Sequence, residues 1–378
     1  MKTLADIQYL KGVNVLTRVD FNVPIKNGVV VDDFRIRMSL PTVQYLMSRG
    51  AKVILIAHLE SSDGSNNSLA PVAQSLNTLG IKTTFVENMR NAKKEIDMMN
   101  DGEVILLNNL RLNEGEKDND PEFAKELASL ADIYVNDAFS VSHREHASVV
   151  GVPQYIQGYV GLQMEQEITH LSRAFTPTHP FIFILGGAKF ETKVPLIDKF
   201  LQTADTVYVA GALANDFFKA QGYEVGVSLL SKGSFDFDSF LHNTKLKIPV
   251  DVVNQDHQMM DANHVSKTDK IMDAGMKSVQ ELGSIISQAQ FILWNGPFGL
   301  YEDGYQGATL EVARMIAEAT QKGATSIIGG GDTLAAVASL GLSDKLTFVS
   351  TGGGAMLDFL ATGTLPGIQA LEHFGKAE

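Results

Sequence analysis

Arginine side chains recur at the ends of short apolar runs in the first half of the chain. Arg18 lies in TRVDFNVP, Arg35 in DDFRIR, Arg111 in NNLRL and Arg144 in SHREHAS. A guanidinium group binds carboxylate or phosphate through two parallel hydrogen bonds, so a cluster of arginines favours a small anionic substrate. Separate surface ion pairs are the alternative interpretation. The net charge of −13 makes clustering informative, because an acidic protein that binds anions must gather its cations locally.

Other polar residues accompany these arginines. Asp20 and Asn22 follow the first apolar run, His58 follows the second in IAHL, and His143 and His146 flank Arg144. A lone histidine at a strand end is more often a hydrogen-bonded structural residue than a catalytic base. The histidines are therefore weaker candidates than the arginines.

Glycine-rich loops in the second half indicate phosphate binding. GGAKFETK places Lys189 and Lys193 about one helical turn apart after an apolar run, and glycine backbone, a helix N-terminus and ammonium groups suit a phosphate. The chain has no G-x-x-x-x-G-K-[ST] and no G-x-G-x-x-G that opens a helix after a strand. A P-loop is therefore excluded, and a dinucleotide-dependent dehydrogenase is disfavoured.

Two further loops carry carboxylates beside glycines. Asp332 and Thr333 end the run GGGDT, and Glu302, in WNGPFGLYEDG, is available for a ribose hydroxyl. Asp332 is either the N-cap of a helix over 333–340 or a ligand that holds Mg²⁺ against nucleotide phosphates. The glycines of the run are Gly329, Gly330 and Gly331.

The elements that must position these residues alternate along the chain. Continuous apolar, β-branched runs are typical of parallel strands buried on both faces, and ligands bind beyond the carboxyl ends of such strands. The predicted fold class is α/β, with two doubly wound, mainly parallel-sheet units joined by a helix. Strands are expected over 13–23, 52–59, 103–110, 132–139, 180–187, 206–212, 249–253, 290–296, 325–330 and 345–351. Helices are expected over 35–50, 120–131, 159–175 and 308–323, and the polar stretch 256–280 has no assignment.

Length and composition exclude several classes of protein. A chain of 378 residues predicts two domains. The absence of cysteine excludes disulfides and thiolate metal sites, and it fits a reducing compartment. No apolar run approaches the roughly 18 residues of a membrane span, and the N-terminus does not read as a signal peptide. We therefore expect a cytoplasmic protein that does not bind membranes, and the acidic charge argues against a nucleic-acid partner.

The motifs together resemble those of the phosphoglycerate kinase family, in the family's order over essentially the whole chain. They are RVDFNVP, DDFRIR, LNNLRL, VNDAF…HREHAS, ILGGAK, WNGPFG, IIGGGDT, STGGGA and LPGIQAL. The resemblance implies reversible phosphoryl transfer between 1,3-bisphosphoglycerate and ADP, which gives 3-phosphoglycerate and ATP in glycolysis. It also implies Mg²⁺ with the nucleotide, a monomer, and two Rossmann-like domains that close about a hinge.

The resemblance assigns a role to each domain and to individual residues. Residues 1–158, with about 360–378 packing back, would bind the acid substrate, and 159–359 would bind the Mg-nucleotide. The substrate residues would be Asp20, Asn22, Arg35, His58, Arg111 and Arg144. The nucleotide residues would be Lys189, Lys193, Gly211, Asn295, Glu302, Gly329, Gly330, Gly331, Asp332 and Thr333, with Asp332 the metal contact. Arg35 and Lys189 would be catalytic.

This reaction needs no general base, because its nucleophile is an ADP phosphate oxygen or a carboxylate and both are already ionised. Catalysis then consists of positioning and of neutralising charge on the transferring group. Arg35, Lys189, Mg²⁺ and helix N-termini would supply that positive field.

The chain departs from the family pattern at several positions. Where the family has an arginine after SHLG, this chain has Ser61, preceded by Glu60. A lost charge-assisted hydrogen bond is worth about 1.5–3 kcal/mol, and Glu60 could add repulsion. The stretch 256–275 is shorter than in the family. Further differences are Asn108 in place of Glu, Glu145 in place of a small residue, and Ala210 and Ala212 in place of glycines. Two alternatives follow: a kinase for a different acyl phosphate, or a weakened nucleotide-binding relative.

Overall fold

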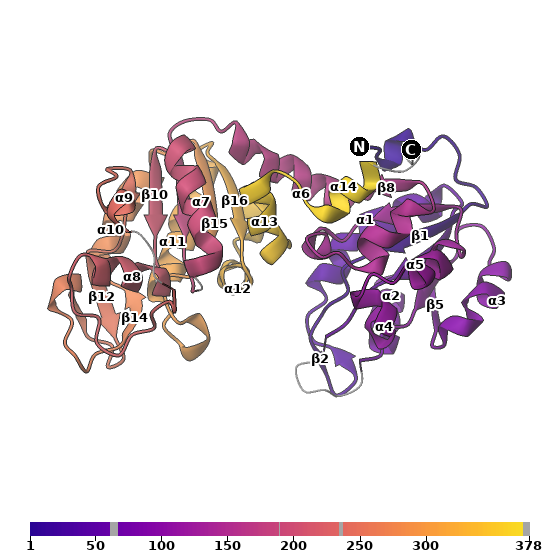
Figure 1. Ribbon diagram of the computed structural model, residues 1–378, viewed down its shortest axis with the longest axis horizontal. Helices are drawn as coiled ribbons and strands as arrows, with labels where there is room; N and C mark the ends of the chain where they lie inside the picture. The colour runs from indigo at the N-terminus through magenta and orange to yellow at the C-terminus, as the bar shows by residue number, and fades with distance from the viewer. Residues whose placement is uncertain (61–66, 189, 234–236, 373–378) are drawn as a thin grey trace. The chain divides into compact units, whose positions relative to one another are not determined.

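The computed structural model describes residues 1–60, 67–188, 190–233 and 237–372 (Figure 1). The chain forms two compact units. Unit 1 comprises Met1–Thr169 together with the chain from Thr362 onward, and unit 2 comprises His170–Ala361. The chain thus leaves unit 1 once and returns to it at its end.

Unit 1 is built on a six-stranded parallel sheet in the order β5-β6-β4-β1-β7-β8. Its inner strands are apolar and buried along almost their whole length, as expected for strands covered on both faces. The strands are β1 (Asn14–Arg18), β4 (Lys52–Ile56), β5 (Thr83–Val86), β6 (Val104–Leu107), β7 (Ile133–Asn136) and β8 (Gly158–Val160).

Helices pack on this sheet through apolar side chains. Val43 and Leu46 of α1 and Val72 of α2 share one buried cluster with Val15 and Val53 of the strands. The helices of unit 1 are α1 (Phe34–Ser48), α2 (Ala70–Thr78), α3 (Ala92–Asp97), α4 (Glu114–Lys117), α5 (Pro121–Ala128), α6 (Leu162–Ser172, which continues into unit 2) and α14 (Pro366–Glu372). A small antiparallel hairpin pairs β2 (Ile25–Lys26) with β3 (Val29–Val30).

Local sequence explains where helix α5 begins. Asp120 is its N-cap and accepts a hydrogen bond from the Phe123 amide at 2.8 Å, and Pro121 occupies the first turn. A proline there loses no helical hydrogen bond, and an aspartate N-cap satisfies a free amide.

The C-terminal helix α14 packs against unit 1. The Gly367 amide donates to the Ser142 carbonyl at 2.8 Å. Leu371 covers Gly158 so closely that a Cβ atom at Gly158 would lie 2.4 Å from the Leu371 Cδ2 atom. A side chain at position 158 would therefore displace the end of the Leu371 side chain.

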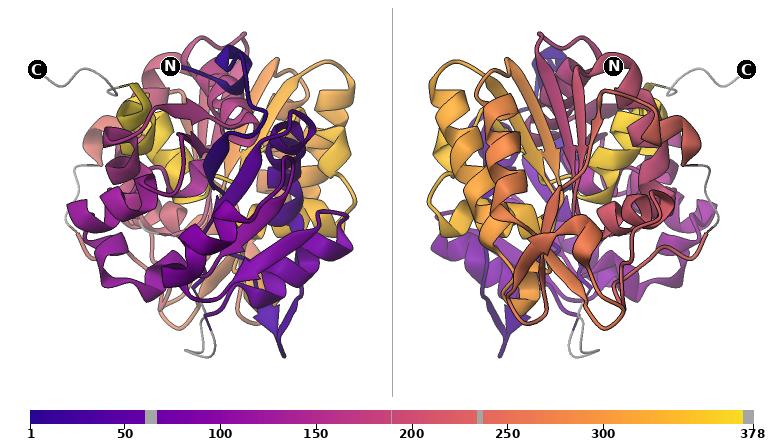
Figure 2. Two further views of the ribbon diagram at one scale, coloured as in Figure 1. Left: turned by 90° about the vertical axis from the view of Figure 1, so that its right-hand side faces the viewer. Right: turned by 90° about the vertical axis from the view of Figure 1, so that its left-hand side faces the viewer.

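Unit 2 contains a second six-stranded parallel sheet, in the order β11-β10-β9-β15-β16-β17. Helices lie on both sides of its strands (Figure 2, right). The strands are β9 (Phe181–Leu185), β10 (Thr206–Val209), β11 (Leu246–Lys247), β15 (Phe291–Asn295), β16 (Thr325–Gly329) and β17 (Phe348–Val349). The helices are α7 (Phe190–Thr203), α8 (Ala212–Ala220), α9 (Asp238–Leu241), α10 (Met276–Ile286), α11 (Gly307–Gln321), α12 (Gly331–Ser339) and α13 (Gly354–Thr362).

The two faces of this sheet carry separate cores. Trp294 and Ile328 face a cluster formed with α10, α11 and α12. On the other face, the Phe183 ring lies 4.4 Å from the Phe200 ring of α7. The strand residues therefore bury both alternating faces, which accounts for their continuous apolar sequence.

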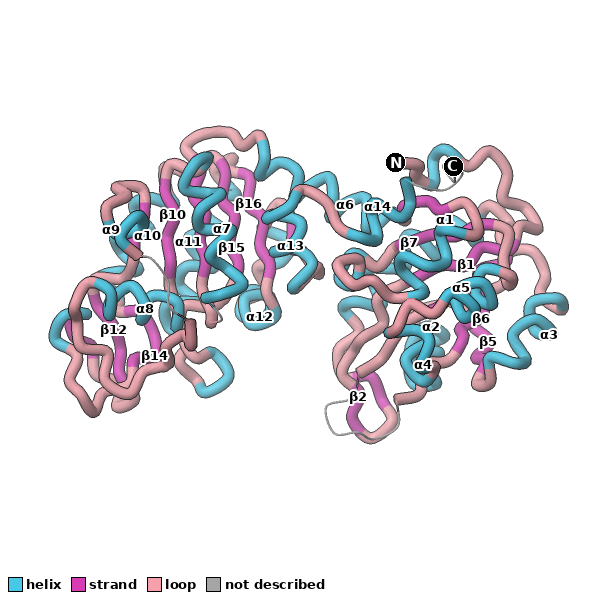
Figure 3. Tube along the Cα trace, in the orientation of Figure 1, coloured by secondary structure: helices cyan, strands magenta, loops and turns pink. Residues whose placement is uncertain are grey.

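A smaller antiparallel sheet, β13-β12-β14, also belongs to unit 2 (Figure 3). Its strands are β12 (Asp251–Asn254), β13 (Met259–Asp261) and β14 (Ile271–Ala274). The strand predicted over 249–253 exists as β12, but it is not part of the parallel sheet. The chain returns directly from β12 into β13 with no crossover helix, and such a short connection permits only antiparallel pairing.

The predicted fold class is confirmed by the two mainly parallel sheets. The helix predicted over 159–175 contains α6, and the boundary between the units falls inside α6, after Thr169. Three edge strands, β5, β8 and β11, were not predicted.

No helix in the described part of the chain has the length and apolarity that a membrane span requires.

Candidate functional site

The carboxyl ends of neighbouring strands bring the unit 1 candidates to one edge of the sheet. Arg18 ends β1, opposite Ile56 of β4 and Asn136 of β7 in the register. His58 follows β4 by two residues, and Asp20 follows β1 by two. The polar residues beyond these three strands therefore share one edge.

Asp20 fixes the position of Arg35. One carboxylate oxygen of Asp20 contacts the Arg35 Nη1 atom at 2.6 Å and accepts the Ser140 hydroxyl at 2.6 Å. The other accepts the Asn22 amide at 3.1 Å. The Asp20 side chain is 9% exposed and that of Arg35 37%, so the paired guanidinium still reaches solvent.

Arg111 is a nearly buried cation beside a carboxylate. Its side chain is 6% exposed, and its Nη1 atom contacts the Oε1 atom of Glu60. Its Nε atom is buried and has no hydrogen-bond partner among the described residues. Burial first, and then the charges of Arg144 and Arg18, lower the pKa of Arg111 to about 10. Arg111 therefore stays charged at neutral pH and favours an incoming anion.

The other arginines of the sequence prediction differ in environment. Arg144 is exposed in the segment after β7. Arg18 is fully buried, and its Nη2 atom lies 3.1 Å from the Nδ1 atom of His58. Arg37, the second arginine of DDFRIR, forms an ion pair with Asp33 at 2.8 Å, one helical turn away, which matches the surface-pair alternative.

His58 and His146 are held neutral at this edge. Burial, followed by the charges of Arg18 and Arg111, lowers the pKa of His58 well below its ordinary value. Burial, followed by the charges of Arg111 and Arg144, lowers the pKa of His146 to about 4. These two histidines therefore add no positive charge to the edge at neutral pH, whereas Arg111 does.

In unit 2, the loops after β9, β10 and β15 pack backbone against backbone. The Gly187 amide donates to the Pro297 carbonyl at 2.8 Å, and the Gly186 amide to the Asn295 carbonyl at 2.9 Å. Gly211 has φ +64°, and a Cβ atom there would lie 2.5 Å from the Gly187 nitrogen. Glycine is required at position 211 for both reasons.

Lys193 braces the same loops. It is 8% exposed, and its Nζ atom donates to the Gly186 carbonyl oxygen at 2.5 Å. Its ammonium group would also lie 3.1 Å from a Cβ atom at Gly187. The lysine therefore places a positive charge directly under the glycine loop.

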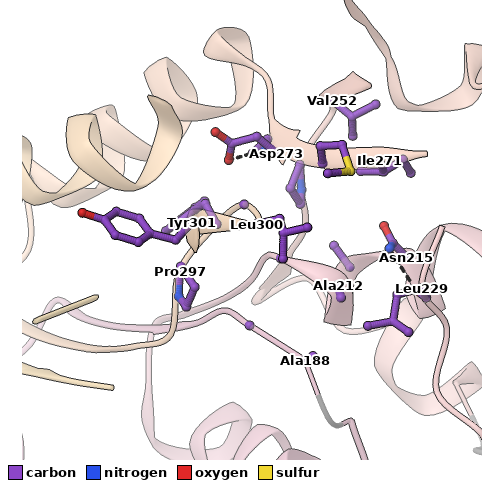
Figure 4. Close-up of a pocket in the computed structure, with 18 of the residues that line it drawn as sticks. Ala188, Ala212, Asn215, Leu229, Val252, Ile271, Asp273, Pro297, Leu300 and Tyr301 are labelled. Carbon is purple, nitrogen blue, oxygen red and sulfur yellow. Dashed lines mark hydrogen bonds between the residues drawn. The ribbon is translucent and has the colours of Figure 1, made fainter. Parts of the chain in front are cut away.

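A cavity of about 540 Å³ opens beside these loops (Figure 4). Ala212, Leu229, Val252, Ile271 and Leu300 give it a largely apolar lining. The lining also includes the candidates Gly211, Glu302 and Asp332. An apolar cavity with a few polar groups suits a planar base with a polar sugar and phosphates.

The alternative interpretation of Asp332 as an N-cap is wrong. The N-cap of α12 is Gly330, at φ +97°, and Asp332 lies within the first helical turn. The helix begins two residues earlier than predicted because glycine adopts the positive φ that the turn requires. Asp332 therefore presents its carboxylate at the edge of the cavity without capping the helix.

The remaining nucleotide candidates support the cavity without lining it. The buried Thr333 hydroxyl accepts the Gly296 amide at 3.1 Å, and the Asn295 Nδ2 atom lies 3.6 Å from the Met356 sulfur. A Cβ atom at Gly329 would lie 2.1 Å from that sulfur. Gly330 is the N-cap of α12 and Gly331 is the first residue of that helix.

The donor set fits a metal ion carried by nucleotide phosphates. In the described ranges, no three histidine, cysteine, aspartate or glutamate side chains gather as a metal site. Asp332 alone offers a carboxylate from the first turn of α12. Mg²⁺ is commonly bound through one or two carboxylates plus substrate phosphates, and Asp332 suits that role.

Two important candidates, Lys189 and Ser61, lie outside the described residues. Sequence reasoning missed other groups: Glu116 and Ser148 in unit 1, and Asp273 in the cavity. Burial raises the pKa of Asp273 to about 7, and its carboxylate accepts the Ala308 amide at 3.2 Å. Glu116 lies in the charged run NEGEKDND, a pattern typical of an exposed surface, so no sequence signal identified it.

Known proteins match the chain along its full length. The family model described as phosphoglycerate kinase matches residues 4–363. A phosphoglycerate kinase of Thermosipho africanus is 44% identical over 100% of this chain and 99% of its own length. One from Clostridioides difficile is 43% identical, with 98% of each chain covered.

Solved structures agree with these sequence matches. The structure of phosphoglycerate kinase from Coxiella burnetii has a TM-score of 0.84 and 34% identity, and the match covers 100% of this chain and 99% of that one. The structure from Pyrococcus horikoshii has a TM-score of 0.85 and 30% identity, with 98% of each chain covered. This chain belongs to the phosphoglycerate kinase family.

Proposed function

We propose that the chain transfers a phosphoryl group reversibly between 1,3-bisphosphoglycerate and ADP, giving 3-phosphoglycerate and ATP, as in glycolysis. The observation that carries the proposal is the full-length match to proteins named for this activity. An arginine-rich edge in unit 1 and an apolar cavity beside glycine loops in unit 2 support the proposal, because they would suit the two kinds of ligand in the reaction.

The acid substrate would bind at the arginine-rich edge of unit 1. Arg35, Arg111 and Arg144 would bind its anionic groups, and His58 and Asn22 would add neutral hydrogen bonds. Asp20 would orient Arg35 through the 2.6 Å contact. This arrangement suits a small molecule that carries carboxylate and phosphate groups.

The nucleotide would bind in unit 2, with the base in the apolar cavity and Glu302 at the ribose. Lys189 and Lys193, with the N-terminus of α12, would neutralise the phosphates. Asp332 would hold Mg²⁺, mainly through the nucleotide phosphates. The bound ion would supply further positive charge to the transferring group.

Catalysis would consist of positioning and charge neutralisation. The nucleophile is already ionised in either direction, and His58 and His146 are neutral with lowered pKa values, so neither needs to act as a base. Arg35 and Lys189 would stabilise the charge on the transferring phosphoryl group.

Direct transfer requires the two substrates to meet, so we propose a hinge-bending cycle in which 1–158 with about 360–378 binds the acid and 159–359 binds the nucleotide. We propose a cytoplasmic monomer on the family resemblance. The full-length identity does not favour a kinase for a different acyl phosphate.

The test is steady-state ATP turnover with 3-phosphoglycerate and Mg²⁺, coupled to a dehydrogenase that consumes the product. We expect turnover of at least about 1–100 s⁻¹, the usual kinase range. A Ser61→Arg variant should lower the KM for 3-phosphoglycerate, and Lys189→Ala should lower kcat far more than it raises either KM. Absence of turnover in the wild type and in Ser61→Arg, with nucleotide still bound, would contradict the proposal.

A further inference from the structure

Arg18 is a buried cation whose hydrogen bonds all have a fixed direction. Its side chain is fully buried at the end of β1. Its Nε atom donates to the Ser148 Oγ atom at 2.9 Å, and its Nη1 atom to the Val19 carbonyl at 2.6 Å. The Nη2 atom lies 3.1 Å from His58 Nδ1. A guanidinium group has no acceptor, so each of these partner atoms must accept.

The contact with Arg18 determines where His58 carries its proton. Because Nδ1 accepts from the guanidinium, the proton of the neutral ring is on Nε2. Protonation of Nδ1 would set two donors against each other. Burial, followed by the charges of Arg18, Arg111 and Arg35, also acts against an imidazolium at neutral pH. The Nε2 atom makes no hydrogen bond with any residue that the structure describes.

Ser148 and Glu116 hold Arg18 in this orientation. The Ser148 hydroxyl donates its one proton to the Glu116 Oε1 atom at 2.6 Å, so its lone pairs face Arg18. The Ser148 amide donates to the other carboxylate oxygen at 2.9 Å. Glu116 and Ser148 are both fully buried. Arg18 and Ser148 therefore connect His58 to the buried Glu116 carboxylate through a series of hydrogen bonds.

We propose that Ser148 and Glu116 are positioning residues that hold the Arg18 guanidinium on His58 Nδ1 and thereby keep His58 as a neutral Nε2–H donor. Such a donor suits an acceptor-only oxygen, a carboxylate or phosphate oxygen of the acid substrate. This assignment of the ligand rests on the proposed function, whereas the tautomer of His58 does not.

The first experiment is ¹⁵N NMR of the imidazole nitrogens in the full chain without substrate. We expect His58 to show an unprotonated Nδ1 and a protonated Nε2 from pH 6 to pH 8. A proton on Nδ1, or an imidazolium at pH 6, would overturn the proposal without any variant being made.

Variants then separate positioning from general support. Ser148→Ala removes the acceptor of Arg18 Nε, and we expect a mixture of His58 tautomers. Tyr134→Phe is the matched control. The Tyr134 hydroxyl donates to the Ser148 backbone carbonyl at 2.6 Å, so its loss leaves the hydrogen bonds of the Ser148 Oγ atom in place. It should leave the tautomer unchanged. An equal shift in both variants would show that His58 responds only to local packing.

If Ser148→Ala does not fold, Arg18→Lys replaces it. Lysine keeps the positive charge but lacks the planar guanidinium that binds Ser148 and His58 at the same time.

Kinetics test the link to the substrate. In Ser148→Ala, the KM for 3-phosphoglycerate should rise about 3- to 10-fold, the equivalent of one weakened hydrogen bond, with kcat nearly unchanged. An unchanged KM together with a changed tautomer would overturn the role in substrate binding. Absence of turnover in the wild type would instead contradict the proposed function, and the NMR result would still decide the positioning.

Discussion

At the scale of single residues, the candidate site pairs its cations with the protein's own carboxylates. Asp20 orients Arg35, whereas Glu60 contacts the nearly buried Arg111 from an exposed position. The Asp20 pair leaves the Arg35 guanidinium reachable. The Glu60 pair occupies a guanidinium that an anionic substrate would need, so the two carboxylates have opposite consequences for binding.

Glu60→Gln should therefore tighten binding of the acid substrate. The amide lacks the charge that competes for Arg111, and a charge-assisted hydrogen bond is worth about 1.5–3 kcal/mol, so the KM for 3-phosphoglycerate should fall about 10-fold. Steady-state kinetics at fixed ionic strength measure this. Glu122→Gln, an exposed position on α5, makes the same change in net charge and is the control. A KM that falls equally in both variants would point to net charge and not to Glu60.

His146 should make the protein sensitive to acid. Its pKa is about 4 in the folded protein, below the value of about 6.5 in an unfolded chain. Between these values the unfolded chain binds the additional proton, so the free energy of unfolding decreases as the pH falls from 6.5 towards 4.

In His146→Gln this contribution is absent, so the free energy of unfolding should fall less steeply over that window. Urea unfolding at pH 8, 6 and 5 measures it, with the difference at pH 8 as the baseline cost of the substitution. A variant that loses stability as steeply as the wild type would show that His146 does not cause the sensitivity.

At the scale of elements, glycines let three loops of unit 2 approach one another. Gly211 combines a positive φ with a neighbouring backbone atom that leaves no room for a side chain. The loops after β9, β10 and β15 thus form one backbone assembly at the edge of the cavity. Their geometry depends on the absence of side chains.

Gly211→Ala should weaken nucleotide binding strongly, because the added Cβ atom would lie 2.5 Å from the Gly187 nitrogen and force the loops apart. Gly341→Ala is a matched control: its φ is +62°, close to the +64° of Gly211, but nothing lies within 4 Å of its Cβ position. Calorimetric titration with Mg-ADP measures binding. Similar losses in both variants would attribute the effect to backbone strain and not to the clash.

The inner parallel strands could be predicted because burial on both faces leaves a continuous apolar run. The edge strands β8 and β11 are short, and β13 and β14 of the antiparallel sheet lie in the polar stretch 256–280, so their sequences carry no such signal. The polar residues at the strand ends, such as Arg18 and Asp332, could also be identified from the sequence. The hydrogen bonds between distant segments could not be predicted from the sequence. Whether Glu116 is buried, or whether Thr333 holds a neighbouring loop, depends on contacts between residues far apart in sequence.

At the scale of the whole molecule, unit 1 is completed by α14, which is separated from the rest of that unit by all of unit 2. Leu371 of α14 is buried against Gly158 of β8, and the Met1 amino group lies 3.8 Å from the Glu372 carboxylate. Unit 2, in contrast, is one continuous segment. The two units therefore depend on different parts of the chain for their stability.

Leu371→Ala should destabilise unit 1 by about 2–5 kcal/mol, the usual cost of truncating a buried leucine. Trp294 is the single tryptophan of the chain and lies in unit 2, so its fluorescence follows unit 2 alone. We expect the far-UV circular dichroism transition to acquire an early phase while the fluorescence transition keeps its midpoint. Gln369→Ala, at an exposed position of α14, is the control. A fluorescence midpoint that moves together with the early phase would show that the two units unfold as one.

Because α14 belongs to unit 1, it also determines the order in which the two units can complete their folding during translation. Domains generally fold as units as they emerge, with the N-terminal one first. The first unit to begin folding cannot be the first to finish, because Leu371 is not available to cover β8 until the ribosome has translated α14. Unit 2 is complete before that point. A nascent chain arrested just before residue 366 would carry a complete unit 2 and an incomplete unit 1.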